Sequence, residues 1–241
     1  MKEVKEYVAG LCAKTKSAAP ALARAGEAQK NAVLADLAAL LESHEDEILA
    51  ANAEDLAAAR EAGIASGMLD RLKLDSARLQ GIRAALGELQ GLHDPVGDGE
   101  CWVRPNGLKI TRVRVPLGVV AVIYEARPNV TVDTAALCIK TGNACVLRGG
   151  KEAIRTNRAL VECIKTALAK NGFDAACCAL LDNTTHVASQ VLMHQRGLVD
   201  CLIPRGGAGL IRSVVENARV PVIETGSGNC HLYVDASADL D

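Results

Sequence analysis

The chain has 241 residues, of which 49% are hydrophobic and 23% charged, enough for one large or two small domains with a substantial core. A formal net charge of -2 gives no bulk attraction to nucleic acid or to an anionic membrane, and an aromatic content of 2% argues against a base-stacking platform. The chain starts without a long apolar stretch, and the apolar run VVAVIY is too short to cross a bilayer. We therefore expect a cytoplasmic protein with neither a nucleic-acid nor a membrane partner.

The nine cysteines form no metal-binding or redox motif. The only close pair is Cys177-Cys178, and adjacent cysteines suit neither a CxxC metal knuckle nor a CxxC redox site. Because no His, Cys and carboxylate set has the spacing of metal ligands, we expect no structural metal. Four further cysteines lie in apolar runs, where we expect them to be buried small hydrophobes in a reducing compartment: Cys138, Cys145, Cys163 and Cys201.

Residues 1–92 predict helices that cover a sheet. Apolar residues between positions 34 and 49 recur at spacings of three, four or seven, as on one face of a helix. Gly63 is expected to end one helix, and Asp75 or Ser76 to begin another as its N-cap. No concentrated chemical motif lies here, so we expect residues 1–92 to be the helical N-terminal part of a larger domain.

Residues 93–117 predict a β-hairpin. Asn106-Gly107 stands between two alternating runs, which is a strong signal for a two-residue turn. The run LKITRVRV alternates apolar and basic residues, so one face of its strand is expected to be wet. Such a ribbon either covers an edge or pairs with a partner subunit, and the sequence leaves both open.

From Gly118 onward, apolar strands alternate with amphipathic helices, two of which are expected to end at Gly142 and Gly172. This pattern predicts an α/β fold with a Rossmann-like parallel sheet and helices on both faces, formed by residues 118–241. VPVIE is expected to be a further strand, and HLYVD another. Right-handed crossovers place every loop after a strand at one edge, where ligands bind near a topological switch point.

Charged residues and glycines follow several of these strands. Arg127, Arg148, Lys151 and Arg205 would gather where helix N-termini point their N–H groups, which predicts an anion site, most simply for the phosphates of a nucleotide. Glycines in these loops would let the backbone approach the ligand closely. RGGAGL does not have the GxGxxG spacing of a dinucleotide fingerprint. The candidate cofactor-binding residues are Glu125, Ala126, Arg127, Pro128, Arg148, Gly149, Gly150, Lys151, Pro204, Arg205, Gly206, Gly207, Glu224, Thr225 and Gly226.

Three blocks carry a family resemblance: VPLGVVAVIYEARPNVTVDTAALCIKTGNACVLRGGKEA, LIPRGGAGLI and VPVIETGSGNCHLYVD. They resemble the gamma-glutamyl phosphate reductases, a family of the aldehyde dehydrogenase superfamily. The resemblance covers nearly the whole chain and implies an aldehyde dehydrogenase-like cofactor-binding domain. It implies reduction of L-glutamyl 5-phosphate by NADPH to L-glutamate 5-semialdehyde and phosphate, in proline biosynthesis, through a cysteine thioester.

The resemblance also implies roles for single residues. Arg148 falls where a lysine usually reaches the adenosine ribose, and with Lys151 it would favour the 2′-phosphate of NADP(H). Glu224 falls on the general-base glutamate of the superfamily, but reduction needs no activated water, so it is expected to position the cofactor. The oxyanion-stabilising position of the superfamily falls on Arg127 when counted from Gly118 and on Glu125 when counted back from Arg148, and Asn129 is the nearest amide.

The nucleophilic cysteine of the family pattern is expected beyond Asp241, so the chain is expected to be the cofactor-binding portion and inactive alone. Cys230 beside His231 looks like an activated nucleophile, but neighbours in a strand point to opposite faces. Two other readings stay open: a non-catalytic assembly or regulatory module, and a cysteine hydrolase using Cys230. The expected partners are an acyl phosphate substrate, a second copy of the chain through the hairpin, and the glutamate 5-kinase of the same pathway.

Overall fold

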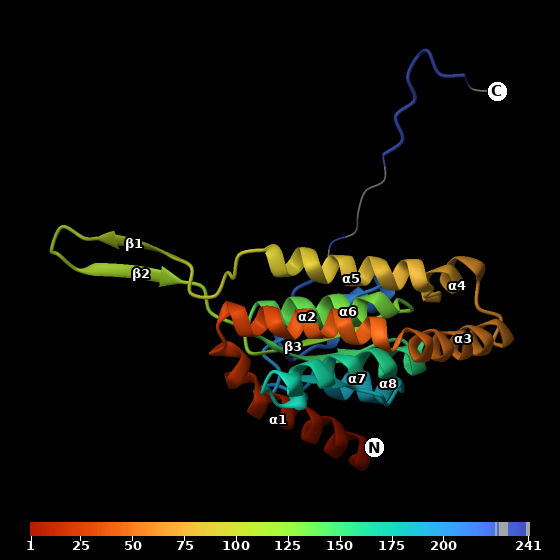
Figure 1. The fold of residues 1–241 in the computed structure, drawn as a ribbon, viewed down its shortest axis with the longest axis horizontal. Helices are drawn as coiled ribbons and strands as arrows, with labels where there is room; N and C mark the ends of the chain where they lie inside the picture. Colours follow the sequence, from red (N-terminus) through yellow and green to blue (C-terminus); the bar gives the residue numbers. More distant parts are fainter. Residues whose placement is uncertain (225, 227–230, 240–241) are drawn as a thin grey trace.

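A computed structural model describes residues 1–224, 226 and 231–239 of the chain. Within these residues, four parallel strands form a central sheet in the order β5-β4-β3-β6, with helices on both faces (Figure 1). The α/β fold class expected from the alternating pattern is therefore confirmed. The strands are β3 (Val119–Tyr124), β4 (Ala144–Arg148), β5 (Cys178–Leu180) and β6 (Cys201–Arg205).

The helices form two layers on one face of the sheet and one layer on the other. The inner layer of the first face consists of α6 (Pro128–Lys140) and α7 (Ile154–Lys170), and the outer layer contains α2 (Glu27–Ser43), α3 (Glu45–Glu61) and α5 (Ser76–Gly91). The short α4 (Ser66–Leu72) connects α3 to α5. The opposite face carries α1 (Lys2–Ala23), α8 (His186–Met193) and α9 (Ala208–Asn217).

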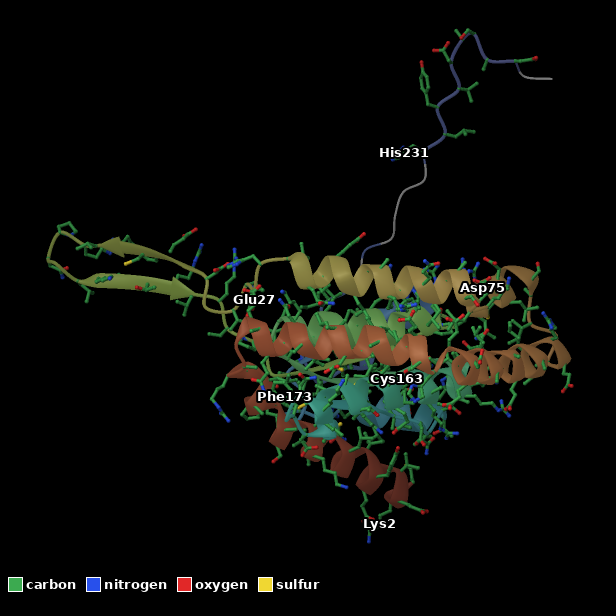
Figure 2. The ribbon with its side chains drawn as sticks, in the orientation of Figure 1. Lys2, Glu27, Asp75, Cys163, Phe173 and His231 are labelled. Atoms are coloured by element: carbon green, nitrogen blue, oxygen red, sulfur yellow. The ribbon has the colours of Figure 1, made fainter. Side chains whose placement is uncertain are left out.

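Local sequence explains where these helices begin, end and pack. In α2, Leu34, Leu37 and Leu41 are fully buried, which matches their helical spacing. Asp75 caps α5, since its carboxylate accepts a hydrogen bond of 2.9 Å from the N–H of Arg78 (Figure 2 labels Asp75 at the start of α5). Gly63 has a φ of 69° just after α3, a conformation that favours glycine. The predicted helix boundaries at these positions are confirmed.

The β-sheet core is apolar throughout. All six residues of β3 are buried, because neighbouring strands flank it on both sides and helices cover both faces. One continuous cluster of buried apolar side chains extends from α1 and α2 through the sheet to α7. The N-terminal helices therefore share the core of the sheet, although the boundaries drawn near residues 92 and 117 stay predictions.

The hairpin exists, but its turn differs from the expected one. β1 (Gly99–Val103) pairs antiparallel with β2 (Lys109–Val113), and the ribbon projects from the body (Figure 1). The expected two-residue turn is wrong: the N–H of Arg104 donates to the carbonyl of Leu108, which leaves three residues between them. A two-residue turn of this kind needs positive φ at both central residues, but only Gly107, at 82°, has one here. The expectation of a single wet face is also wrong, because the residues of both strands are exposed except Ile110.

The end of the chain departs furthest from expectation. The segment VPVIE forms no strand: it makes one parallel bridge, between Val222 and Leu202 of β6. Residues 231–235 are also not a strand but exposed coil, and Figure 2 shows His231 on a segment that leads away from the body. The alternating sequence of a strand does not fold as one here, since no described neighbour pairs with it. Among the described helices, none has the length and apolar character needed to span a membrane.

Candidate functional site

The carboxyl ends of the parallel strands meet at one edge of the sheet, and two neighbours there have connections that leave in opposite directions. The chain passes from β3 through α6 toward β4, whereas from β6 it passes through α9 away from β3. The edge between β3 and β6 is therefore the switch point at which α/β sheets bind ligands. The loops that begin at Glu125 and Gly206 lie there.

A cavity of about 580 Å³, here named the α8 cavity, opens beside this edge. Its volume is in the range of small-molecule and cofactor sites. Charged and glycine residues at the end of β4 and in the loops after β3 and β4 line one part of it, namely Glu125, Arg148, Gly150, Lys151 and Glu152. The remaining wall is formed mainly by Thr184, Thr185, His186, Ser189, Gln190, Met193, Leu210 and Ser213.

Arg148 is held in place by backbone carbonyls. Its Nη2 donates to the carbonyl of Thr184 at 2.7 Å and its Nη1 to that of Gly149 at 3.1 Å, while its buried Nε has no partner. Burial lowers the pKa of Arg148, and the nearby carboxylate of Glu152 opposes this shift. An arginine stays charged under such conditions, so the side chain presents a fixed positive charge to the α8 cavity.

A second cavity of about 230 Å³, the switch cavity, lies between the loops after β3 and β6. It is lined by Met68, Arg71, Glu125, Ala126, Arg127, Val130, Arg205, Gly206 and Gly207. Glu125 also lines the α8 cavity, so the two cavities adjoin at this side chain. Its Oε2 accepts a hydrogen bond of 3.0 Å from the N–H of Gly207, the N-cap of α9.

The loop after β3 has an unusual backbone. Ala126 has a φ of 26°, a left-handed value that non-glycine residues seldom adopt. Its N–H donates to Oε1 of Glu152 at 2.9 Å, and the residue is buried. Strain of this kind persists where surrounding contacts fix the chain, and it concentrates at functional sites.

The glycines of these loops are explained more by internal packing than by close approach to a ligand. A Cβ on Gly149 would lie 2.2 Å from Nδ2 of Asn157, and one on Gly206 would lie 2.7 Å from the carboxylate of Glu125. On Gly207, by contrast, a Cβ would meet only Glu125 at 3.8 Å, so this backbone is open. Packing within the protein is therefore enough to explain glycine at Gly149 and Gly206, whereas at Gly207 the expectation that glycine gives a ligand room stays a prediction.

A third cavity of about 470 Å³, the α6 cavity, lies on the other side of Arg71 and Arg127, which line both it and the switch cavity. Asn129 and Asp133 of α6 also line it, and the amide of Asn129 donates to Oδ2 of Asp133 at 3.0 Å. Burial raises the pKa of Asp133, and the hydrogen bond from Asn129 opposes the shift. The remaining lining residues are Asp70, Lys73, Leu74, Arg78, Gly81, Ile82, Ala85 and Pro128.

Most of the predicted site residues lie around these cavities, and a few do not. Glu224 and Gly226 are exposed and line none of the three cavities, Gly149 is buried and also lines none, and Pro204 is buried inside β6. Thr225 and Cys230 lie outside the described residues. The residues of α8 and of the loop before it, which line the α8 cavity, were not among the predicted site residues. The rule that predicted the other loops applies equally to Thr184 and Thr185, which follow β5.

The described cysteines are not placed as nucleophiles. Of the eight in residues 1–224, only Cys101 in the hairpin is exposed, and none lines the three cavities. Burial raises the pKa of Cys12 and Cys177 to about 12 and that of Cys163 to about 11. At neutral pH these thiols are protonated, which makes them poor nucleophiles. Within the same part of the chain, no group of His, Cys, Asp and Glu is arranged to hold a metal ion.

Two curated proteins with similar sequences carry the same name. The gamma-glutamyl phosphate reductase of Desulfitobacterium hafniense is 55% identical over 227 residues, which cover 94% of this chain and 54% of that protein. The gamma-glutamyl phosphate reductase of Moorella thermoacetica is 53% identical over 229 residues, covering 95% and 55%. The chain thus spans about half the length of the curated relatives it matches.

Solved structures agree with these sequence matches. The gamma-glutamyl phosphate reductase of Thermotoga maritima superposes with a TM-score of 0.90 at 41% identity, over 97% of this chain and 56% of that one. The enzyme of the same name from Saccharomyces cerevisiae gives 0.82 at 29% identity, over 98% and 60%. The model of the aldehyde dehydrogenase family matches residues 2–241. The chain belongs to the aldehyde dehydrogenase family.

Proposed function

We propose that this chain forms the NADPH-binding part of a gamma-glutamyl phosphate reductase, an enzyme that reduces L-glutamyl 5-phosphate to L-glutamate 5-semialdehyde and phosphate in proline biosynthesis. Membership of the aldehyde dehydrogenase family implies a nicotinamide cofactor. The names of the most similar relatives support the substrate. We also propose residues 1–92, 93–117 and 118–241 as the helical part, the ribbon and the nucleotide-binding core of a cytoplasmic enzyme.

The observation that carries the proposal is the α8 cavity with its partly buried cation, Arg148. Arg148 lines this cavity, and its hydrogen bonds to the carbonyls of Thr184 and Gly149 hold its positive charge in place there. Lys151 is exposed on the same cavity and adds a second positive charge. These residues fit a dinucleotide phosphate, and we propose that they favour the 2′-phosphate of NADPH over the hydroxyl of NADH.

The polar wall of α8 and the loops around Glu125 would hold the rest of the cofactor, which supplies hydride when bound. The open N–H of Gly207, at the start of α9, suits a pyrophosphate once the carboxylate of Glu125 turns aside. Glu224 is proposed to position the cofactor, since reduction of a thioester needs no activated water. The nucleophilic thiolate is not proposed among the cysteines of residues 1–224, because those lie away from the cavities.

Thermal unfolding with and without nucleotide tests this proposal. NADPH is expected to raise the unfolding temperature saturably, with about 2.7 kcal/mol of stabilisation at a hundred times its Kd. Lys151→Gln is expected to reduce the preference for NADPH over NADH, whereas Lys5→Gln, an equal change on the exposed face of α1, leaves it intact. No shift with millimolar nucleotide would overturn the proposal.

We further propose that the ribbon joins two copies of the chain. Each of its strands has one edge without a strand partner among the described residues, a feature that favours pairing with another chain. Several of its apolar side chains are exposed, including Val103 and Val113. The glutamate 5-kinase that would make the substrate is proposed as a functional partner.

A further inference from the structure

The α6 cavity is bordered by charges of both signs that form no ion pair among the described residues. Arg71 and Arg127 make no ion pair within residues 1–224, 226 and 231–239, and Asp133 makes none in the same part of the chain. Two guanidinium groups and a carboxylate thus border one cavity without neutralising one another. A ligand with an anionic group at one end and a cationic group at the other would complement them.

The other charged residues of this cavity are already engaged. Nη2 of Arg78 donates to Oδ1 of Asp70 at 2.8 Å, and its Nη1 donates to the carbonyl of Lys73 at 2.8 Å. Lys73 forms an ion pair with Asp75 at 3.0 Å. Arg71, Arg127 and Asp133 are therefore the groups available to a ligand, while Arg78 gives the cavity a fixed wall.

The two arginines lie on the side of the proposed nucleotide site, and the carboxylate lies on the other side of the cavity. Arg71 and Arg127 also line the switch cavity, which adjoins the proposed NADPH site. Asp133 instead lines an apolar groove of about 310 Å³ between α5 and α6, with Leu86, Leu89 and Leu137. The cavity therefore has a positively charged end next to the proposed nucleotide site and a negatively charged end beside an apolar surface.

We infer that the α6 cavity is the amino-acid pocket, in which Arg71 and Arg127 hold the phosphate of an amino-acyl phosphate and Asp133 selects its α-ammonium group. The inference rests on the proposed function and names the residues that read its substrate. Asn129 is a positioning residue here, since its amide fixes one carboxylate oxygen of Asp133. This differs from the oxyanion role expected of Asn129. Asp133 is half-buried, and burial disfavours the charged form of its carboxylate. A bound ammonium group would favour that charged form again, which supports the assignment.

Two phosphonates test the inference by isothermal titration calorimetry on the chain. L-2-Amino-6-phosphonohexanoate resembles the substrate in length and charge, and 6-phosphonohexanoate lacks only the amino group. The amino compound is expected to bind at least about tenfold more tightly, since a site with a charged partner rejects the analogue that leaves it unpaired. Asp133→Asn is expected to bring this ratio close to one, and Asn129→Ala to lower it partly.

The arginine variants make the complementary test. Arg71→Gln and Arg127→Gln are each expected to weaken both phosphonates by about tenfold and to leave their ratio unchanged. Arg104→Gln, the same change at the exposed tip of the ribbon, serves as the matched control. The unfolding temperature of each variant shows whether it folds. The ratio of the two phosphonate affinities is also measured on the wild-type chain, where no substitution can disturb the fold.

Failure of the inference and failure of the proposed function give different results. If NADPH protects the chain but the amino compound does not bind saturably, or binds no better than its analogue, the amino-acid pocket is wrong and the nucleotide site stands. An unchanged ratio in folded Asp133→Asn also overturns the role of that residue. If NADPH gives no protection, the proposed function itself falls, whatever the phosphonates do.

Discussion

Glu125 places its carboxylate at the start of α9, where Oε2 accepts the N–H of Gly207 at 3.0 Å. Glu125 follows β3 and Gly207 follows β6, so this bond joins the two loops of the switch point. A negative side chain thus occupies the N–H that the proposed function assigns to a nucleotide phosphate. The carboxylate of Glu125 and the phosphate would therefore compete for one N–H donor and for the positive end of one helix dipole.

Glu125→Gln is expected to tighten NADPH binding by about 3–10-fold at low salt, because the amide keeps an acceptor for Gly207 but repels no phosphate. The gain is expected to shrink as salt screens the charges. Titration calorimetry at two salt concentrations measures both effects. Glu216→Gln, on the exposed surface of α9, is the control and is expected to change little. Weaker binding by Glu125→Gln would show that the carboxylate holds the ligand rather than competing with it.

The parts of the fold that depend on local pattern could be predicted from the sequence. The buried strand β3 and the helix cap at Asp75 each depend on residues that are close together in the sequence. Each can therefore be recognised from one short segment. The strand-end rule also placed Arg148, Lys151 and Gly207 at one edge, because parallel strands fix the side on which every loop emerges.

The parts that depend on distant contacts could not be predicted. Gly149 and Gly206 look like ligand-binding glycines in sequence, but their neighbours are Asn157 and Glu125, which only the folded chain brings near. The two-residue turn predicted for the ribbon is wrong for a local reason. Asn106-Gly107 also fits a longer connection, in which only the glycine has a positive φ.

Gly149→Ala is expected to lower the free energy of unfolding by about 1–3 kcal/mol, as overpacking does in tight sites. The new methyl would lie 2.2 Å from Asn157 and 3.1 Å from the ring of Tyr124, both of which are buried. Urea unfolding measures the loss. Gly10→Ala in α1 has nothing within 4 Å of the added Cβ and is expected to raise the same free energy by about 0.5–1 kcal/mol. A Gly149→Ala chain as stable as the wild type would contradict this packing argument.

The single tryptophan of the chain reports on the proposed pairing of ribbons. Trp102 lies in β1 opposite Ile110 and is 42% exposed. If two ribbons pair, its emission is expected to shift to shorter wavelength as protein concentration rises, together with a doubling of the mass in sedimentation. Val103→Lys is expected to suppress both changes, since it places a charge on the edge.

Val215→Lys is the matched control for the ribbon, because Val215 is also an exposed apolar residue but lies on α9. It is expected to leave the concentration dependence unchanged. A constant mass and a constant emission over the whole concentration range would contradict pairing through the ribbon.

Tyr7 ties α1 to the loop after β5, since its hydroxyl donates to Oδ1 of Asp182 at 2.6 Å. Tyr7→Phe is expected to lower the free energy of unfolding at pH 7 by about 0.5–1 kcal/mol, the small value appropriate to a solvent-accessible pair. Burial and the hydrogen bond raise the pKa of Tyr7 to about 12, and the same bond, helped by Arg158, lowers the pKa of Asp182. Tyr233→Phe, whose hydroxyl contacts only nearby Asp235 on an exposed segment, is the control and is expected to have no effect.

The two pKa shifts set the pH window of the Tyr7 contribution. The folded pKa of Asp182 lies below its unfolded value of about 3.9, so the stabilisation is complete above that pH and is lost as pH falls through the folded pKa. The folded pKa of Tyr7 lies above its unfolded value of about 10, so the contribution is complete below that pH and disappears as pH rises through the folded value. Urea unfolding of both chains at pH 7 and in acid therefore gives a difference that is constant near neutrality and declines in acid. A difference that persists unchanged in acid would show that Tyr7 acts through packing and not through Asp182.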